Sequence, residues 1–186
     1  GSGLLGFAQF PNSSGLSGIN ANNGAANTDG VVADYRSFGS KNIYPAGNYS
    51  APYDLGRTMT HEVGHWLGLR HIWGDANCGN DFCNDTPQTQ TSNGGCPTQT
   101  TCDGIQDMVQ NYMDYTNDAC MNIFTDDQKT RIRTVMTVSP RRASLAASTV
   151  CQNPISDDAG ISDVVTPAGT LCGGNFTPEI TLKNYG

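Results

Sequence analysis

The sequence predicts an α+β protein. Residues 4–10 and 31–38 are short apolar runs closed by Pro, Gly, Asn and Ser residues, which is typical of β-strands. Helical signals come later: an amphipathic stretch follows Asp54, and a second helix is expected to begin after Thr125. Strands early in the chain and helices after them together indicate the α+β class.

The chain is expected to divide into three parts. Residues 1–150 form the first domain, 151–159 a linker rich in Pro, Asp and Ser, and 160–186 the start of an incomplete β domain. Strand-like runs at 161–165 and 179–184 support the third part. Two strands cannot form a stable core sheet alone. Either further strands precede residue 4, so that the first domain is N-terminally truncated, or one face of its sheet is poorly covered.

The composition excludes several classes of protein. Ten Lys and Arg residues against 17 Asp and Glu residues give a formal net charge of −7. This charge argues against nucleic acid or an anionic membrane as the main partner. No apolar run is long enough to form a transmembrane segment. Seven cysteines and few charged residues favour an oxidising, extracellular location.

Both helices of the first domain carry recognisable start signals. Asp54 is expected to cap the first helix. Its apolar stripe would consist of Met59, Val63, Trp66 and Leu67.

The second helix should begin with Thr125 as N-cap and Gln128 at the third helical position, and run to about residue 137. Ser139 followed by Pro140 predicts a further short helical segment. Three apolar side chains of the second helix are expected to face inward: Ile132, Val135 and Met136.

The first helix carries the pattern His-Glu-x-x-His-x-x-Gly-x-x-His at residues 61–71. His61 and His65 are four residues apart, so their imidazoles share one face of the helix. Gly68 lets the chain leave the helix, which would bring His71 back as a third ligand. Three nitrogen ligands leave a fourth position open, as in catalytic zinc sites. Glu62 stands beside that position and suits the role of a general base acting on a zinc-bound water.

Two other interpretations of the motif are weaker. The three histidines of the motif are the only ones in the chain, so chance placement on a surface helix is a poor explanation. A closed structural zinc site would leave Glu62 without a role. The sequence therefore favours a catalytic zinc site.

Residues 75–110 are polar and too long for an unsupported loop in a compact domain. Disulfides would staple this segment, and bound calcium is a second means of support. A solvated loop is the alternative for each carboxylate. The cysteines available are Cys78, Cys83, Cys96, Cys102 and Cys120, and the candidate oxygen ligands are Asp75, Asp81, Asp85, Asp103 and Asp107.

The extended zinc motif with a later methionine resembles the metzincin metalloproteases. Within them the chain is most similar to the pappalysin family, in its secreted bacterial and archaeal members. The resemblance covers residues 4–137 and rests on the run at 4–11, the motif and its continuation to residue 73, Asp-Thr-Pro at 85–87, Gly-Cys-Pro at 95–97, Asn-Tyr-Met-Asp-Tyr at 111–115 and Asp-Ala-Cys-Met at 118–121. It implies a twisted sheet, an active-site helix and a C-terminal helical subdomain.

The resemblance also implies roles for single residues. Met113 matches the methionine that forms an apolar floor beneath the three imidazoles. Tyr115 matches a tyrosine that donates a hydrogen bond to the tetrahedral intermediate. Asp118 matches an acidic residue in the pocket for the side chain after the scissile bond, where it would favour Arg or Lys. For Asp118 the alternative is an ordinary carboxylate in an exposed loop.

Further implications of the resemblance concern cross-links, calcium and the precursor. Family precedent suggests disulfides Cys78–Cys102 and Cys96–Cys120, which leaves Cys83 unassigned; Cys151 with Cys172 is a further guess. Asp85 lies in a stretch similar to the family's calcium-binding loop and is the first candidate calcium ligand. A helix, more strands and a pro-segment are expected before residue 4.

Taken together, these features predict a zinc-dependent endopeptidase that binds protein or peptide substrates. An extended substrate would add antiparallel to the edge strand at Gly6, Phe7 and Ala8, because an exposed edge offers unpaired backbone groups. An edge strand without a ligand is the alternative for that stretch. For the whole chain, the alternative is a non-catalytic, secreted, calcium-stabilised binding module that retains a relic metal site.

Overall fold

The computed structural model describes residues 3–20, 24–149, 159–166 and 179–184. The chain forms two compact units, Gly1–Leu145 and Ala146–Gly186. Residues 151–158 of the predicted linker 151–159, and Cys151 with Cys172, lie outside the described residues. No helix in the described ranges is long and apolar enough to cross a membrane.

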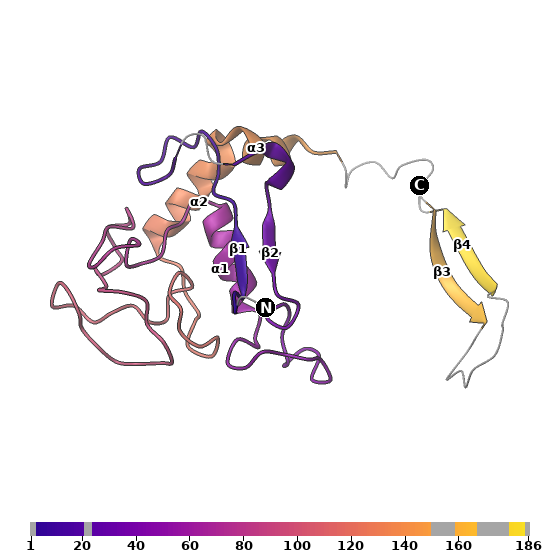
Figure 1. Cartoon of the computed structure of the whole chain (residues 1–186). Helices are drawn as coiled ribbons and strands as arrows, with labels where there is room; N and C mark the ends of the chain where they lie inside the picture. The colour runs from indigo at the N-terminus through magenta and orange to yellow at the C-terminus, as the bar shows by residue number, and fades with distance from the viewer. Residues whose placement is uncertain (1–2, 21–23, 150–158, 167–178, 185–186) are drawn as a thin grey trace. The chain divides into compact units, whose positions relative to one another are not determined.

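The first unit contains a small antiparallel sheet of two strands. β1 (Gly6–Ala8) pairs with β2 (Val31–Ala33), and Phe7 lies opposite Val32. Both strands lie within the predicted apolar runs, 4–10 and 31–38, but are shorter than those runs. A short 3₁₀-helix, Ala26–Thr28, lies in the connection between them. Helix α1 (Arg57–Trp66) packs against both strands (Figure 1).

The start of α1 differs from the sequence-based prediction. Gly56 is the N-cap, with φ +81°, and Asp54 makes no capping hydrogen bond to the helix. Asp54 instead pairs with Lys41. The free backbone N–H groups are satisfied from elsewhere in the chain: Oδ2 of Asp118 accepts from the N–H groups of Leu55, at 2.7 Å, and Arg57, at 3.2 Å. The prediction that Asp54 caps this helix was therefore wrong, because the carboxylate of Asp118, 61 residues beyond Arg57, takes that place.

The predicted apolar stripe of α1 holds only in part: Met59, Trp66 and Leu67 are half-buried, but Val63 is not. Val63 is 36% exposed. The helix turns a polar face inward because that face lines the functional site and not an apolar core. Its buried residues are Thr58, His61, Glu62, Gly64 and His65.

Helix α1 ends in a turn that only glycine adopts without strain. Gly68 has φ +87°. Its N–H donates to the carbonyl of His65, and the N–H of Leu69 donates to the carbonyl of Gly64, both at 2.9 Å. This pair of hydrogen bonds is a Schellman motif, which satisfies the last carbonyls of the helix and reverses the chain. The reversal sends the following residues back toward α1.

Helix α2 (Asp126–Val138) confirms the prediction made from its first residues. Thr125 and Gln128 form a reciprocal capping box. Val135 is fully buried, and Ile132 packs at the edge of the core. Helix α3 (Pro140–Ala143) begins after Ser139, as predicted, and leads into a 3₁₀-helix at Ser144–Ala147.

The apolar core of the first unit is small and lies directly behind the histidine motif. Its buried members are Leu69, Ile72, Trp73 and Met113. Three of the four follow α1 immediately, and Met113 reaches them from a loop. The core therefore fixes the turn after α1 to the loop that precedes α2.

Residues 67–125 contain no helix or strand among the elements of the structure. This segment is cross-linked by two disulfides, Cys78–Cys102 and Cys96–Cys120, the pairs that the family resemblance suggested. Buried Asp side chains support it further. Asp107 accepts hydrogen bonds from the backbone N–H and the hydroxyl of Thr101, and Asp114 accepts them from the backbone N–H and the side-chain amide of Asn93.

A buried ionic cluster ties α3 to the end of α1. The guanidinium of Arg142 lies 3.8 Å above the ring of Trp66 and pairs with Asp29. Asp29 also accepts from the indole N–H of Trp66 at 3.0 Å and pairs with Arg141. Arg142 is only 1% exposed, so the carboxylate of Asp29 is needed to compensate its charge.

The second unit contains an antiparallel hairpin of β3 (Ala159–Thr166) and β4 (Glu179–Asn184). Both strands fall where strand-like runs were predicted. The register is irregular at two places, between Ile161 and Asp163 and between Val164 and Thr166.

Candidate metal centre and active site

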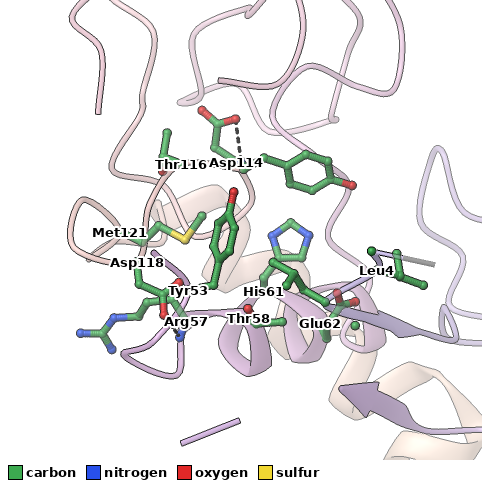
Figure 2. Close-up of a pocket in the computed structure, with 14 residues that line it drawn as sticks. Leu4, Tyr53, Arg57, Thr58, His61, Glu62, Asp114, Thr116, Asp118 and Met121 are labelled. Atoms are coloured by element: carbon green, nitrogen blue, oxygen red, sulfur yellow. Dashed lines mark hydrogen bonds between the residues drawn. The ribbon is translucent and has the colours of Figure 1, made fainter. Parts of the chain in front are cut away.

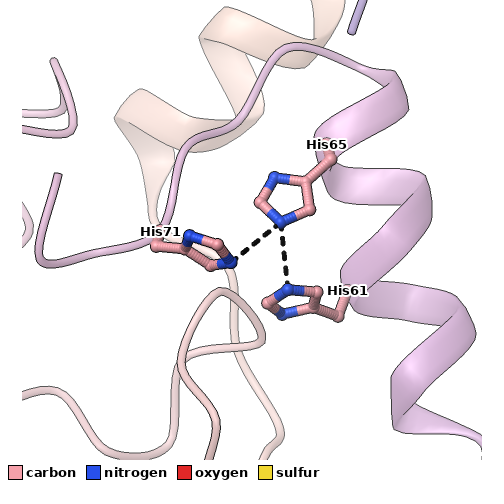
Figure 3. A group of neighbouring side chains, drawn as sticks. All are labelled: His61, His65 and His71. Atoms are coloured by element: carbon pink, nitrogen blue, oxygen red, sulfur yellow. Dashed lines mark hydrogen bonds between the residues drawn. The ribbon is translucent and has the colours of Figure 1, made fainter. Parts of the chain in front are cut away.

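Three imidazoles converge at the end of α1. His61 and His65 occupy successive turns of the helix, and the turn at Gly68 returns His71 to face them (Figure 3). Nε2 of His65 lies 3.0 Å from Nε2 of His61 and 3.1 Å from Nε2 of His71. His61 and His65 are buried, and His71 is partly exposed.

The protonation pattern of these rings favours a shared cation. Nδ1 of His61 lies 2.7 Å from the carbonyl oxygen of Tyr112, and Nδ1 of His65 lies 2.8 Å from that of Leu69. A carbonyl oxygen only accepts, so each Nδ1 carries the hydrogen and each Nε2 presents a lone pair. Burial lowers the pKa of His61 to about 3 and that of His65 to about 4, so both rings are neutral. The short contacts between Nε2 atoms therefore join two hydrogen-bond acceptors with no hydrogen between them. A metal ion bound by these lone pairs would account for such contacts.

The donor set fits zinc. Tetrahedral coordination with Zn–N bonds of about 2.0–2.1 Å separates ligand nitrogens by about 3.3 Å, close to the observed distances. In the described part of the chain this is the only group of three or more His, Cys, Asp or Glu side chains close enough to share a metal ion.

Glu62 lies beside the imidazoles at the mouth of a pocket. Its side chain is 7% exposed, and burial raises the pKa of its carboxyl group to about 7. β1 approaches it so closely that a Cβ on Gly6 would lie 2.9 Å from Cγ of Glu62. The absence of a side chain at Gly6 therefore leaves room for the carboxylate of Glu62.

Tyr115 lies beside two of the three imidazoles. Its ring centroid is 5.5 Å from that of His61 and 4.9 Å from that of His71. Tyr115 is 47% exposed. Burial of part of the ring and the charge of Glu62 raise the pKa of Tyr115, which keeps the hydroxyl protonated as a hydrogen-bond donor.

Met113 lies beneath the helix turn that joins the two helical histidines. It is fully buried, and a Cβ on Gly64 would meet its sulfur at 2.5 Å. Gly64 therefore allows the methionine to approach the backbone between His61 and His65. The loop that carries Met113 is tied to α2, because Asn111 and Gln128 exchange two side-chain hydrogen bonds.

A pocket of ≈ 230 Å³ opens beside Glu62 and His61. Figure 2 shows its arrangement: Leu4, Glu62 and His61 lie at one side, and Met121 and Asp118 lie at the other. Most of the lining is apolar, and Asp118 is 2% exposed. Burial raises the pKa of Asp118, against the effect of the two backbone N–H groups that it accepts.

The strand β1 borders this pocket and has one free edge. Gly6, Phe7 and Ala8 pair with β2 along one side. In the described residues no strand pairs with the other side of β1. Phe7 is 56% exposed.

A comparison with known proteins decides the family. The model of a peptidase family described as Pregnancy-associated plasma protein-A matches residues 7–137, more than half of the chain. The chain belongs to this family, the pappalysins. The resemblance seen in the sequence is thereby confirmed.

Curated relatives of this pappalysin are named extracellular metalloproteases. One from Coccidioides posadasii is 41% identical over 133 residues, which cover 70% of this chain and 44% of the relative. Another, from Verticillium alfalfae, is 41% identical over 137 residues, with 71% and 45% of the two chains covered. These names confirm the predicted extracellular location. The pappalysin chain spans about half the length of the curated relatives it matches.

Solved structures of mirolysin from Tannerella forsythia share the fold. A promirolysin mutant is 45% identical with a TM-score of 0.62, and the match covers 76% of this chain and 45% of that one. Mature mirolysin in complex with a cleaved peptide is 42% identical with a TM-score of 0.59, covering 78% and 55%. The metzincin-like, mixed helix and strand fold predicted from the sequence is therefore confirmed for the matched part.

The predicted calcium ligand Asp85 has a different observed contact. Its Oδ2 accepts from the backbone N–H of Asp127 at 2.9 Å, in the first turn of α2. The neighbouring Asp81 is buried and accepts from the hydroxyl of Thr86 and the backbone of Cys83. Asp81 and Asp103 line a second, polar pocket of ≈ 240 Å³, but Asp85 does not. Calcium at this pappalysin loop stays a prediction.

Two side chains beside the metal centre were not assigned to it from the sequence. Trp73 stacks on His71 with ring centroids 4.2 Å apart and planes 6° from parallel. Asp75, which the sequence placed among the candidate calcium ligands, contacts Nδ1 of His71 through Oδ1. The spacing of four residues between His71 and Asp75 was the available signal, but it suggests a contact only if a turn joins them.

Proposed function

We propose that this chain is the catalytic part of a secreted zinc-dependent endopeptidase. The observation that carries the proposal is the meeting of three Nε2 lone pairs next to a buried carboxyl group with a raised pKa. Membership of the pappalysins and the names of the relatives support it. His61, His65 and His71 would hold the zinc ion.

When bound, zinc would supply Lewis-acid polarisation of the scissile carbonyl and make water more acidic. Glu62 acts as general base: it accepts a proton from the attacking water while the water oxygen bonds to the carbonyl carbon. When the C–N bond breaks, Glu62 returns this proton to the leaving amine nitrogen. A base with a pKa near the working pH is suited to both transfers.

Tyr115 is proposed to donate its hydroxyl hydrogen to the oxygen that gains negative charge. Its ring contacts two of the imidazoles, and its raised pKa keeps the hydroxyl group protonated. Such a donor contributes up to about 3–4 kcal/mol to transition-state stabilisation. The free edge of β1 at Gly6, Phe7 and Ala8 is proposed to bind the substrate as an added antiparallel strand.

The pocket next to Glu62 is proposed to receive the side chain that follows the scissile bond. Its apolar walls suit the methylene groups of Arg or Lys, and the carboxylate of Asp118 would pair with their charge. Arg57 also lines this pocket. Asp118 lines the pocket and is 2% exposed, so water screens its carboxylate only weakly, which supports a preference for Arg or Lys.

The test of the catalytic proposal is cleavage of a peptide library by the zinc-loaded protein and by Glu62→Gln. We expect both proteins to bind one zinc ion, and Glu62→Gln to lose peptide hydrolysis. Retained turnover in Glu62→Gln would reject its role as base. Zinc binding without cleavage in the parent would favour the alternative, a non-catalytic binding module. Global unfolding on zinc removal would instead indicate a structural metal site.

The specificity proposal requires a control because Asp118 also accepts hydrogen bonds from backbone N–H groups at the start of α1. Asp118→Asn keeps an oxygen for the N–H groups of Leu55 and Arg57 but removes the charge. We expect this variant to lose its preference for Arg over Leu after the cleaved bond while it remains folded. Asp54→Asn, a change at a buried carboxylate that does not line the pocket, should leave the cleavage profile unaltered. An Asp118→Asn profile identical to that of the parent would end this proposal.

A further inference from the structure

We propose that Asp75 is a positioning residue for the metal centre: it fixes the ring of His71 with Nε2 directed at the other two imidazoles, and Arg70 fixes Asp75. This inference rests on the zinc site of the proposed function. It adds a side chain outside the histidine motif to the groups that determine metal affinity.

The three histidines are supported in different ways. His61 and His65 belong to α1, and their Nδ1–H groups donate to backbone carbonyls of packed segments. His71 lies beyond the helix, and a side chain, Asp75, accepts from its Nδ1. A ligand on a loop has no helix to set its direction. Its orientation therefore depends on the groups that contact the ring.

Asp75 reaches His71 because the chain makes a tight turn between them. The N–H of Gly74 donates to the carbonyl of His71 at 2.8 Å. Gly74 and Asp75 have φ values of +61° and +59°, and such values are uncommon for residues other than glycine. Backbone strain of this kind, of order 1–3 kcal/mol, persists only where surrounding contacts hold it and is concentrated at functional sites.

Arg70 provides the contacts that hold this turn. Its guanidinium donates to Oδ2 of Asp75 from Nε at 3.2 Å and from a terminal nitrogen at 3.0 Å, and to the carbonyl of Gly74 at 2.8 Å. The two oxygens of the Asp75 carboxylate thus have different partners: Oδ2 accepts hydrogen bonds from Arg70, and Oδ1 contacts Nδ1 of His71. With one oxygen fixed by a two-point contact, the other oxygen has a defined position.

A second contact that limits the movement of His71 comes from Trp73, which stacks flat on the imidazole. Stacking limits the tilt of the ring but leaves rotation within its own plane. The hydrogen bond from Nδ1 to Asp75 removes that rotation. Together the two contacts define the direction of the Nε2 lone pair.

A carboxylate partner also makes the imidazole a stronger ligand than a carbonyl partner does, because it stabilises positive charge on the ring. Removing such a partner typically weakens metal binding by about 10- to 100-fold. Asp75 is 41% exposed, so part of its charge is screened by water. We therefore assign most of the effect to orientation, which the following variants separate from charge.

The experiment measures the zinc dissociation constant by competition with a chromophoric chelator. Asp75→Asn keeps an oxygen that accepts a hydrogen bond from Nδ1 of His71, and asparagine tolerates the positive φ at this position. This variant therefore removes the negative charge alone. Asp75→Gly removes the side chain without adding backbone strain. We expect zinc affinity to fall by about 10- to 100-fold in Asp75→Gly and by a smaller factor in Asp75→Asn. The matched control is Asp126→Asn, which changes an exposed carboxylate paired with Lys129.

Arg70→Gln tests whether Arg70 acts through Asp75. In the parent background this change should weaken zinc binding, and in the Asp75→Gly background it should add little. A purely structural role for either residue would give additive losses, and the metal-free melting temperature would fall together with affinity. Additive effects, or an Asp75→Gly affinity within about twofold of the parent, would overturn the inference. Failure of the parent to bind zinc would instead reject the proposed function.

A second readout follows the imidazole itself. The chain has only three histidines, so NMR of ¹⁵N-labelled histidine gives three assignable rings. In the metal-free protein the Nδ1–H signal of His71 should be protected from exchange, and Asp75→Gly should abolish this protection without changing the signals of His61 and His65. An unchanged His71 signal in Asp75→Gly would contradict the assigned contact.

Discussion

Replacement of Gly6 by alanine should damage catalysis through the position of Glu62. A Cβ at Gly6 would lie 2.9 Å from Cγ and 3.0 Å from Oε1 of Glu62, and 2.9 Å from the carbonyl oxygen of Val32. Carbon atoms in contact prefer separations of about 3.5–4.0 Å, so Glu62 would have to move by about 0.6 Å or more. Val32 belongs to the paired strand β2 and cannot retreat without breaking the sheet.

The expected cost has two components. Overpacking of this kind typically destabilises a protein by about 1–3 kcal/mol, which a urea titration would measure. Misplacement of a catalytic group by about 1 Å costs about 100-fold in rate, so kcat/KM for a peptide substrate should fall by a similar factor. The three atoms nearest to this methyl group belong to Glu62 and Val32 and not to a histidine, so zinc content should stay at the parent level.

Gly30→Ala is the matched control for Gly6→Ala. Gly30 immediately precedes β2, has no positive φ, and a Cβ there would meet no atom within 4 Å. It should retain the activity and stability of the parent. If Gly6→Ala behaved like Gly30→Ala in both assays, the close approach of β1 to Glu62 would not exist in solution.

Three further predictions concern stability and reactivity. Burial acts to raise the pKa of Asp29, but the hydrogen bond and charge of Arg142 outweigh it and lower the pKa below 3.8. Ionised Asp29 therefore stabilises the fold above pH 4, and the stability advantage of the parent over Asp29→Asn in urea titrations should shrink as the pH falls below 4. A difference that stays constant with pH would contradict the pairing of Asp29 with Arg142. Burial and the charge of Asp81 raise the pKa of the Cys83 thiol to about 12, so a thiol reagent at pH 8 should label it only after unfolding, and rapid labelling of the folded protein would show that it is accessible. Chelation of calcium at fixed zinc should lower the melting temperature if the loop at Asp85 binds calcium, and an unchanged melting curve would remove calcium from the structure of this loop.

Local features were predictable from the sequence. The capping box of α2 involves Thr125 and Gln128, three residues apart, so the pattern carries all the information that the geometry needs. The same holds for the histidines of α1, whose spacing sets a common face, and for Gly68, whose positive φ permits the reversal.

Features that depend on distant residues were not predictable. Asp54 has the right residue type and place for a cap, but Asp118 accepts from the start of α1 because the loop after Met113 returns there. Val63 matches an apolar helix stripe, yet it is partly exposed because α1 buries the polar groups of the site. Asp75 could not be assigned to His71 from the sequence, since their contact requires two consecutive residues with positive φ.

The two overlapping cross-links determine where this protein can work. Half of the site, namely His71, Met113 and Tyr115, lies in residues 67–125, which contain no helix or strand of the structure. Both disulfides lie within the same segment. Each bridge closes a loop of similar length, for which the entropy lost by the unfolded chain corresponds to about 3 kcal/mol. Cytosolic thiols would open both bridges and release that stretch. Synthesis inside a reducing cell would therefore leave α1 with two ligands in place and the third side of the site unformed.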